Sequence, residues 1–163
     1  MYQNEGLNEI NKKYPDIDFS KLDGKVVVPV GAICDKLNID IKFIDLEDGH
    51  AGYFDHTQNT IFVNEKYPAT RNLFTVAHET GHFILHAGSN NRFDEYHKYT
   101  PDERKREYEA NAFAGKLLMP ENKFVEVFKK YKGFFPKIAD IFGVSVRACE
   151  VRAFNLGLID NVW

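Results

Sequence analysis

The sequence predicts an α+β protein in which a small antiparallel three-stranded sheet packs on a helical bundle. Short segments between residues 39 and 64 have strand-like patterns bounded by turn residues, whereas the flanking stretches have the apolar periodicity of helices. Of the 163 residues, 44% are apolar and 14% are aromatic, which is enough for a folded core. Strands that follow one another and are flanked by helices are typical of the α+β class.

The first 38 residues lead into the predicted sheet. Residues 1–25 are polar and rich in Asn, Asp and Lys, so we expect a loose or short-helical lead-in segment. Residues 26–38 begin as an extended stretch up to Pro29 and continue as a helix with Ile33 and Leu37 among its apolar side chains.

Three strands are expected next. Residues 39–46 alternate between apolar and polar side chains with one slip, which indicates a strand. Residues 52–55 and 60–64 flank a polar turn and are typical of a hairpin. The second hairpin strand leads almost directly into an apolar helix that starts near Thr70, so we expect the sheet to lie beside this helix.

That helix carries the motif His-Glu-x-x-His at residues 78–82. Residues four apart share one face of a helix, so His78 and His82 can bind one metal ion together. Glu79 is turned by one residue step, which suits a general base for a water on the open side of a zinc ion. Because the flanking residues are apolar, an uncompensated Glu79 would be costly to bury.

Two histidines are too few for a zinc site, so a third ligand is required. His86 lies eight residues beyond His78, or about 12 Å along a helix axis, which is too far for one ion. The next predicted helix, residues 100–119, offers Glu107 and Glu109. These two glutamates flank its apolar face at similar angles, so periodicity alone does not choose between them.

The stretch after Pro120 has the pattern of a helix-turn-helix over residues 134–158. Residues 120–163 contain seven basic and five acidic residues, and the second helix of the pattern offers Arg147 and Arg152 without a dense basic face. We therefore expect a packing element or a docking surface for the substrate, and we do not expect this chain to bind DNA.

Three sequence blocks together resemble the ImmA/IrrE family of metallo-endopeptidases over about residues 26–158. The blocks are Ala77-His78-Glu79-Thr80-Gly81-His82, Glu109-Ala110-Asn111-x-Phe113-Ala114 and Leu117-Leu118-Met119-Pro120. The resemblance implies that Glu109 is the third zinc ligand, because it stands at the Glu-Ala-Asn position of the family. It also implies a cytoplasmic protease that acts on a helix-turn-helix transcriptional repressor, often one encoded beside it on a mobile element.

We expect three parts in the chain: a lead-in segment (1–25), a zinc metallopeptidase-like core (26–120) and a helix-turn-helix-like unit packed on that core (121–163). No run of 18 apolar residues occurs and the first residues lack the build of a signal peptide, so neither a membrane span nor secretion is expected. Cys34 and Cys149 are expected as buried free thiols, which suits the cytoplasm.

The function predicted on these grounds is that of a zinc-dependent endopeptidase. Zn²⁺ would be held by His78, His82 and Glu109, with Glu79 as the general base, and the substrate would be a specific protein partner. An extended substrate could be added to the hairpin edge near Thr60–Asn64. Two alternatives remain open: a non-catalytic regulator that binds and inactivates a repressor or another partner, and a DNA-binding regulator with a structural zinc.

Overall fold

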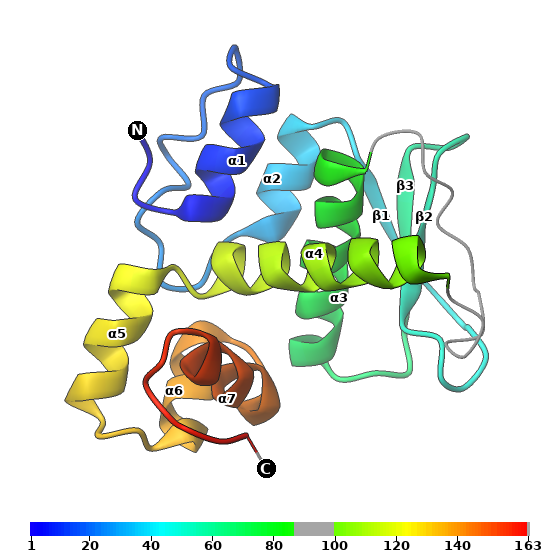
Figure 1. The fold of residues 1–163 in the computed structure, drawn as a ribbon. Helices are drawn as coiled ribbons and strands as arrows, with labels where there is room; N and C mark the ends of the chain where they lie inside the picture. Colours follow the sequence, from blue (N-terminus) through cyan, green and yellow to red (C-terminus); the bar gives the residue numbers. More distant parts are fainter. Residues whose placement is uncertain (87–99, 163) are drawn as a thin grey trace. The chain divides into compact units, whose positions relative to one another are not determined.

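The computed structural model describes residues 1–86 and 100–162, and within these residues the chain forms seven helices and three strands (Figure 1). They are, in order, α1 (Glu5–Lys13), α2 (Val30–Lys36), β1 (Asp40–Ile44), β2 (Gly52–Asp55), β3 (Thr60–Asn64), α3 (Ala69–Leu85), α4 (Pro101–Leu118), α5 (Glu121–Lys130), α6 (Phe135–Phe142) and α7 (Val146–Asn155). Two compact units share the chain, one made of residues 29–114 and the other of residues 1–28 and 115–163. The division into three parts predicted from the sequence stays a prediction.

The sheet belongs to the unit of residues 29–114, and its strand order is β1-β3-β2. The α+β class is therefore confirmed, but the sheet is mixed, and the prediction of an antiparallel sheet was wrong for β1. β3 pairs antiparallel with β2 and parallel with β1, with Asp40 opposite Thr60. The alternation of side chains is the same in either strand direction, so the pattern could not reveal the parallel pair. Because β3 is paired on both sides, its edge is closed to an added peptide strand.

Helix α3 packs on β2 and β3 and also contacts α2. Gly52 permits a close approach of helix and sheet, because a Cβ atom there would lie 2.9 Å from Cγ2 of Thr75. On another side of α3, a Cβ atom at Gly81 would lie 2.9 Å from Cδ1 of Phe113 and 3.3 Å from the backbone of Ala110. The small residues at this crossing let α3 and α4 approach closely, and they thereby set the spacing between side chains that the two helices present to each other.

The other unit begins with α1, so the lead-in segment predicted as loose or short-helical contains a regular helix. Asn4 caps it: the side-chain oxygen accepts from the backbone N–H of Leu7 at 3.1 Å. The side-chain amide of Asn4 donates to the carbonyl of Leu117 at 2.8 Å. Gly6 also lies against Leu117, because a Cβ atom at Gly6 would be 2.8 Å from Cα of Leu117. These contacts fix α1 against the last turn of α4.

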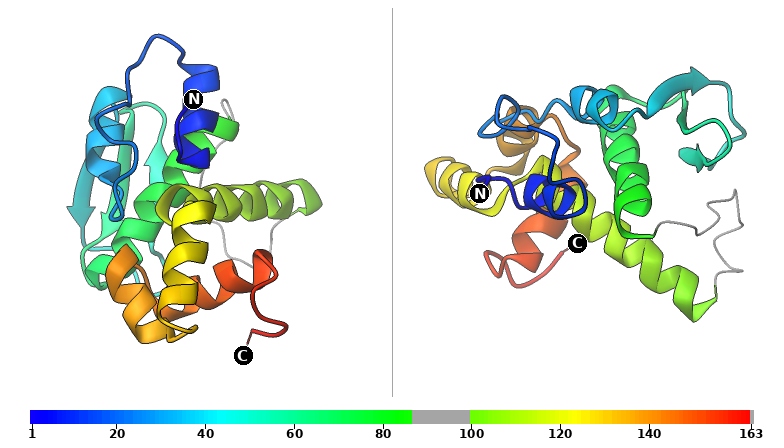
Figure 2. Two further views of the ribbon diagram at one scale, coloured as in Figure 1. Left: turned by 90° about the vertical axis from the view of Figure 1, so that its left-hand side faces the viewer. Right: turned by 90° about the horizontal axis from the view of Figure 1, so that it is seen from above.

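Helices α6 and α7 pack against each other, and Figure 2 shows them beside α5 in the same unit. Gly143 ends α6 in the left-handed conformation with φ 70°, and Ser145 caps α7 by accepting from the N–H of Ala148 at 3.1 Å. A pair of helices joined in this way also occurs as a simple packing element. The helix-turn-helix unit therefore stays a prediction.

A buried arginine on α7 links several helices of this unit. The Arg152 side chain is 9% exposed, and its Nη2 lies 3.5 Å from Oε1 of Glu5. Its Nε donates to the carbonyl of Met119 at 3.0 Å. The Glu5 carboxylate also accepts from the backbone N–H of Glu121 at 3.1 Å. This arginine cluster (Arg152, Glu5, Met119 and Glu121) links α1, α7 and the start of α5.

None of the helices in the two described ranges combines the length and the apolar character that crossing a bilayer requires.

Candidate metal centre

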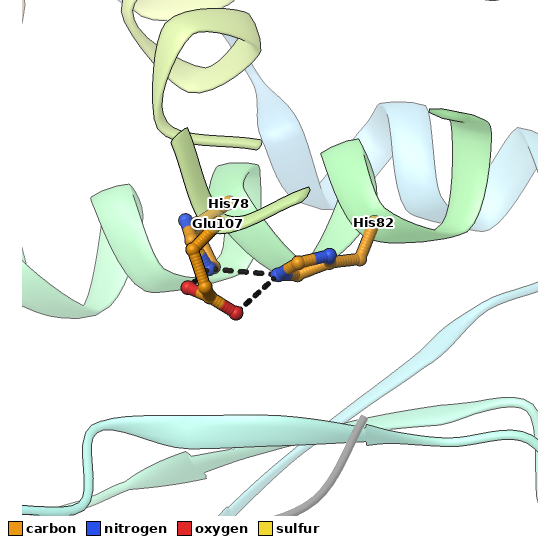
Figure 3. A group of neighbouring side chains, drawn as sticks. All are labelled: His78, His82 and Glu107. Carbon is orange, nitrogen blue, oxygen red and sulfur yellow. Dashed lines mark hydrogen bonds and ion pairs between the residues drawn. The ribbon is translucent and has the colours of Figure 1, made fainter. Parts of the chain in front are cut away.

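His78, His82 and Glu107 bring one potential ligand atom each to a common point, and these atoms lie within 4.8 Å of one another. Figure 3 shows the two histidines on α3 and Glu107 on α4 with their polar ends together. The Nε2 atoms of His78 and His82 are 3.1 Å apart. Oε2 of Glu107 lies 3.0 Å from Nε2 of His78, and Oε1 lies 2.8 Å from Nε2 of His82. We call these three residues the metal cluster.

The metal cluster follows from local structure and from the helix crossing. The His-x-x-x-His spacing puts both imidazoles on one face of α3, one turn apart. Glu107 reaches them because α3 and α4 approach closely where Gly81 meets Ala110. The site is partly enclosed: the exposed fractions of the side chains are 14% for His78, 4% for His82 and 32% for Glu107.

The charges in the metal cluster are strongly coupled. Burial disfavours the charged form of Glu107, but hydrogen bonds and charge interactions with His78 and His82 outweigh it and hold the pKa of this carboxyl far below its ordinary value. Burial lowers the pKa of His82, and the neighbouring His78 adds to this. Burial also acts against a charged His78, but Glu107 and Glu79 outweigh it and raise the pKa of His78. One ionised carboxylate therefore faces two imidazole nitrogens.

This set of atoms fits a metal ion. Imidazole nitrogens and a carboxylate oxygen are common ligands of zinc and related divalent metals, and three protein ligands leave a position open for water or substrate. Two Nε2 atoms that face each other at 3.1 Å are also placed as co-ligands of one ion. His78, His82 and Glu107 could therefore hold a metal ion in common.

Each histidine of the metal cluster is also held at its far nitrogen. Nδ1 of His78 lies 2.8 Å from Oδ1 of Asn111, which stands four residues after Glu107 on the same face of α4. Nδ1 of His82 lies 3.2 Å from Nδ1 of His86, and Nε2 of His86 lies 2.9 Å from Oε2 of Glu109. Such outer partners orient a histidine and fix which of its nitrogens carries the hydrogen.

Glu109, the third ligand expected from the resemblance, does not lie with His78 and His82. Its carboxylate pairs with His86, and Glu107 occupies the place expected for Glu109. The physical reason is that the crossing at Gly81 and Ala110 turns the Glu107 side of α4 toward the Nε2 atoms. The geometry therefore favours Glu107 as the third ligand.

Sequence reasoning left Glu107 open and did not assign roles to Asn111 and His86. The spacing of Glu107 and Asn111 was a usable signal, because two polar residues four apart on one face of α4 can serve both nitrogens of one histidine.

Glu79 is buried in α3, with an exposed fraction of 6%. It follows His78 directly, and its charge contributes to the raised pKa of that histidine. A carboxylate so close to the metal cluster can take up and release a proton there. Its role as a general base stays a prediction.

Comparison with known proteins adds three findings. Residues 34–154 match the model of a peptidase family described as the IrrE N-terminal-like domain. The radiation response metalloprotease IrrE of Deinococcus radiodurans is 33% identical over 96 residues, which cover 57% of this chain and 29% of that protein. The solved structure of a Mycobacterium tuberculosis transcriptional regulator matches with a TM-score of 0.62 at 16% identity, over 91% of this chain and 45% of that one. At this identity the structural likeness shows the fold alone, and the chain spans less than half the length of either relative.

Proposed function

The chain belongs to the family of the IrrE N-terminal-like domain, and on this premise we propose that it is a zinc-dependent endopeptidase. The observation that carries the proposal is the convergence of His78, His82 and Glu107 within 4.8 Å, with Glu79 buried on the same helix. Two imidazoles, one carboxylate and an adjacent second carboxylate are the groups that metal-assisted hydrolysis of a peptide bond requires.

His78, His82 and Glu107 would hold zinc, which when bound supplies Lewis acidity toward a peptide carbonyl and toward water. Glu79 then accepts the proton of the attacking water and delivers it to the leaving amine. Asn111 orients His78 through its Oδ1 atom, so that Nε2 of that histidine stays directed toward Glu107.

The proposed substrate is a specific cytoplasmic protein, a helix-turn-helix repressor encoded near this chain. An extended substrate cannot pair with β3, which is the central strand. β2 (Gly52–Asp55) is an outer strand of the three-stranded sheet and packs against α3, the helix that carries the motif. We therefore place the substrate strand on the outer edge of β2.

The two alternatives from the sequence have less support. Of the two arginines on α7, Arg152 is buried. The charge of Arg147 is paired with Glu150 on the same helix, since Nη1 of Arg147 lies 3.8 Å from Oε2 of Glu150. The outward side chains of α7 include Val151 and Phe154, with exposed fractions of 39% and 47%. This surface suits contact with protein better than contact with phosphate groups. A non-catalytic binding regulator, in turn, would have no need of Glu79.

The test is to co-express the chain with the adjacent repressor and to follow the length of the repressor. Glu79→Gln should retain zinc, since Glu79 is not a ligand, and should cleave at least about 10²–10⁴-fold more slowly. Glu65→Gln, at an exposed glutamate in the turn after β3, is the matched control and should cleave like the wild type. If wild type and Glu79→Gln relieve repression equally while the repressor stays intact, the chain is a binding regulator.

A further inference from the structure

We infer that His86 and Glu109 form a positioning relay that fixes His82 as a metal ligand. This inference rests on the proposed zinc site, and it assigns a role to two residues that lie outside the metal cluster. The relay runs from Nδ1 of His82 to Nδ1 of His86 over 3.2 Å, and from Nε2 of His86 to Oε2 of Glu109 over 2.9 Å.

The chemistry of the two rings gives the relay a direction. A carboxylate only accepts, so Nε2 of His86 carries a hydrogen and donates it to Glu109. The Nδ1 atom of His86, which lies 3.2 Å from Nδ1 of His82, then accepts the Nδ1 hydrogen of His82. In this form the Nε2 atom of His82, which lies 3.1 Å from Nε2 of His78 and 2.8 Å from Oε1 of Glu107, would give its lone pair to a bound metal ion, as a metal ligand must.

Burial makes this arrangement specific. The side chains of His82 and His86 are 4% and 7% exposed, so solvent has little access to the nitrogens between them. Glu109 is 39% exposed and lies at the outer end of the relay, where its carboxylate stays hydrated. A buried Nδ1 hydrogen without an acceptor would be costly, so the acceptor on His86 stabilises the ligating form of His82.

The relay also explains why α4 has two glutamates near the motif. Glu107 reaches the Nε2 side of His82 directly, and Glu109 reaches the Nδ1 side through His86. Both ring nitrogens of His82 are thus linked to glutamates of α4. His78 needs no such intermediate, because Asn111 contacts its Nδ1 directly.

A simpler role must be distinguished, in which His86 and Glu109 only tie the end of α3 to α4. Two amide variants separate the roles, because the amide of Asn stands near the place of Nδ1 and that of Gln near the place of Nε2. His86→Asn keeps an acceptor for His82 and loses the contact with Glu109. His86→Gln keeps the contact with Glu109 and loses the acceptor.

The experiment measures zinc affinity by competition with a chromogenic chelator, together with the melting temperature of the zinc-free protein. His86→Gln and His86→Ala should bind zinc about 10–100-fold more weakly than the wild type, as is typical when an outer partner of a ligand is removed. His86→Asn should recover most of that loss, and Glu109→Gln should weaken binding by less than about tenfold. The control His56→Ala, at an exposed histidine in the hairpin turn, should bind like the wild type.

The outcomes separate the relay from the proposed function. If the wild type takes up no zinc, the proposed function fails. If the wild type binds zinc and His86→Gln binds it equally well, only the relay is overturned. The relay is also overturned if His86→Asn is as weak as His86→Gln, or if the zinc affinities merely follow the melting temperatures. Should His86→Ala not fold, the two amide variants and Glu109→Gln still decide.

Discussion

The two units each contain a cluster of charged and polar side chains, but the clusters differ in how donors and acceptors are matched. In the arginine cluster, opposite charges face each other: Nε of Arg152 donates to Met119, and the Glu5 carboxylate faces the guanidinium and accepts from Glu121. Nη2 of Arg152 is buried without a hydrogen-bond partner among the described residues and meets Glu5 only as an ion pair at 3.5 Å. In the metal cluster, two imidazole nitrogens converge on each other and on one carboxylate. Complementary groups make a structural link, whereas converging ligand atoms make a binding site.

The contrast predicts opposite responses to mutation. Changes in the arginine cluster should lower the stability of the fold and leave zinc binding intact. Changes in the metal cluster should abolish zinc binding and leave the zinc-free fold largely intact. Each of the following experiments either supports or breaks this separation.

The largest effect is expected from Glu107→Gln. The amide cannot replace a charged ligand. Loss of an outer partner of a ligand weakens metal binding by up to about 100-fold, and we expect zinc affinity to fall by more than that here. Chelator competition measures this, and Glu109→Gln is the matched control on the same helix, with a loss of less than about tenfold. Equal losses in both variants, or a loss only at Glu109, would return Glu109 to the role of third ligand.

The second largest effect is expected from Arg152→Ala, and it should be on the stability of the fold. The substitution leaves the carbonyl of Met119 without its donor in a buried place, which we expect to lower the free energy of unfolding by about 2–4 kcal/mol. The ion pair with Glu5 adds little to this loss, because that carboxylate is 36% exposed and screened by solvent. Arg147→Ala on the exposed side of α7 should change stability by less than about 0.5 kcal/mol. A loss of zinc affinity in Arg152→Ala would break the separation of the two clusters.

The smallest effect is expected at the helix crossing. Gly81→Ala forces α3 and α4 apart, which lowers the free energy of unfolding, whereas the better helix propensity of Ala raises it. We expect the free energy of unfolding to fall by about 1–2 kcal/mol in total. Zinc should also bind more weakly, because the crossing sets the distance of Glu107 from the histidines. Gly115→Ala is the control: among the residues that the structure describes, a Cβ atom there would meet Cδ of Arg152 at 4.0 Å. It should raise stability by up to about 1 kcal/mol and leave zinc affinity unchanged. Unfolding by urea, with and without zinc, tests both variants.

The parts of this molecule that depend on local spacing could be predicted from the sequence. The helix around His78 and His82 and the family resemblance are confirmed, since both rest on residues within a few turns of each other or on fixed blocks. The cap of α4 also depends on a local spacing of three residues: Thr100 accepts from the N–H of Glu103 at 3.2 Å, and the Glu103 side chain accepts from the N–H of Thr100 at 3.0 Å.

The parts that depend on how elements meet could not be predicted. Glu107 and Glu109 lie at similar angles on α4, and the way α4 meets α3, with Ala110 against Gly81, goes with Glu107 facing the histidines. The parallel pairing of β1 with β3 likewise depends on the chain placing β2 at the far side of the sheet. A pattern of alternating side chains carries no information about that choice.

The division of the chain between the two units sets the order in which they can form during synthesis. Residues 29–114 are contiguous, so every element of the metal cluster has been made before α5, α6 and α7 exist. The helix α1 is made first, but its partners Leu117 and Glu121 are made much later. Domains tend to fold as units as they leave the ribosome. We therefore expect the nascent chain to complete its metal centre before α1 can pack against Leu117 and Glu121.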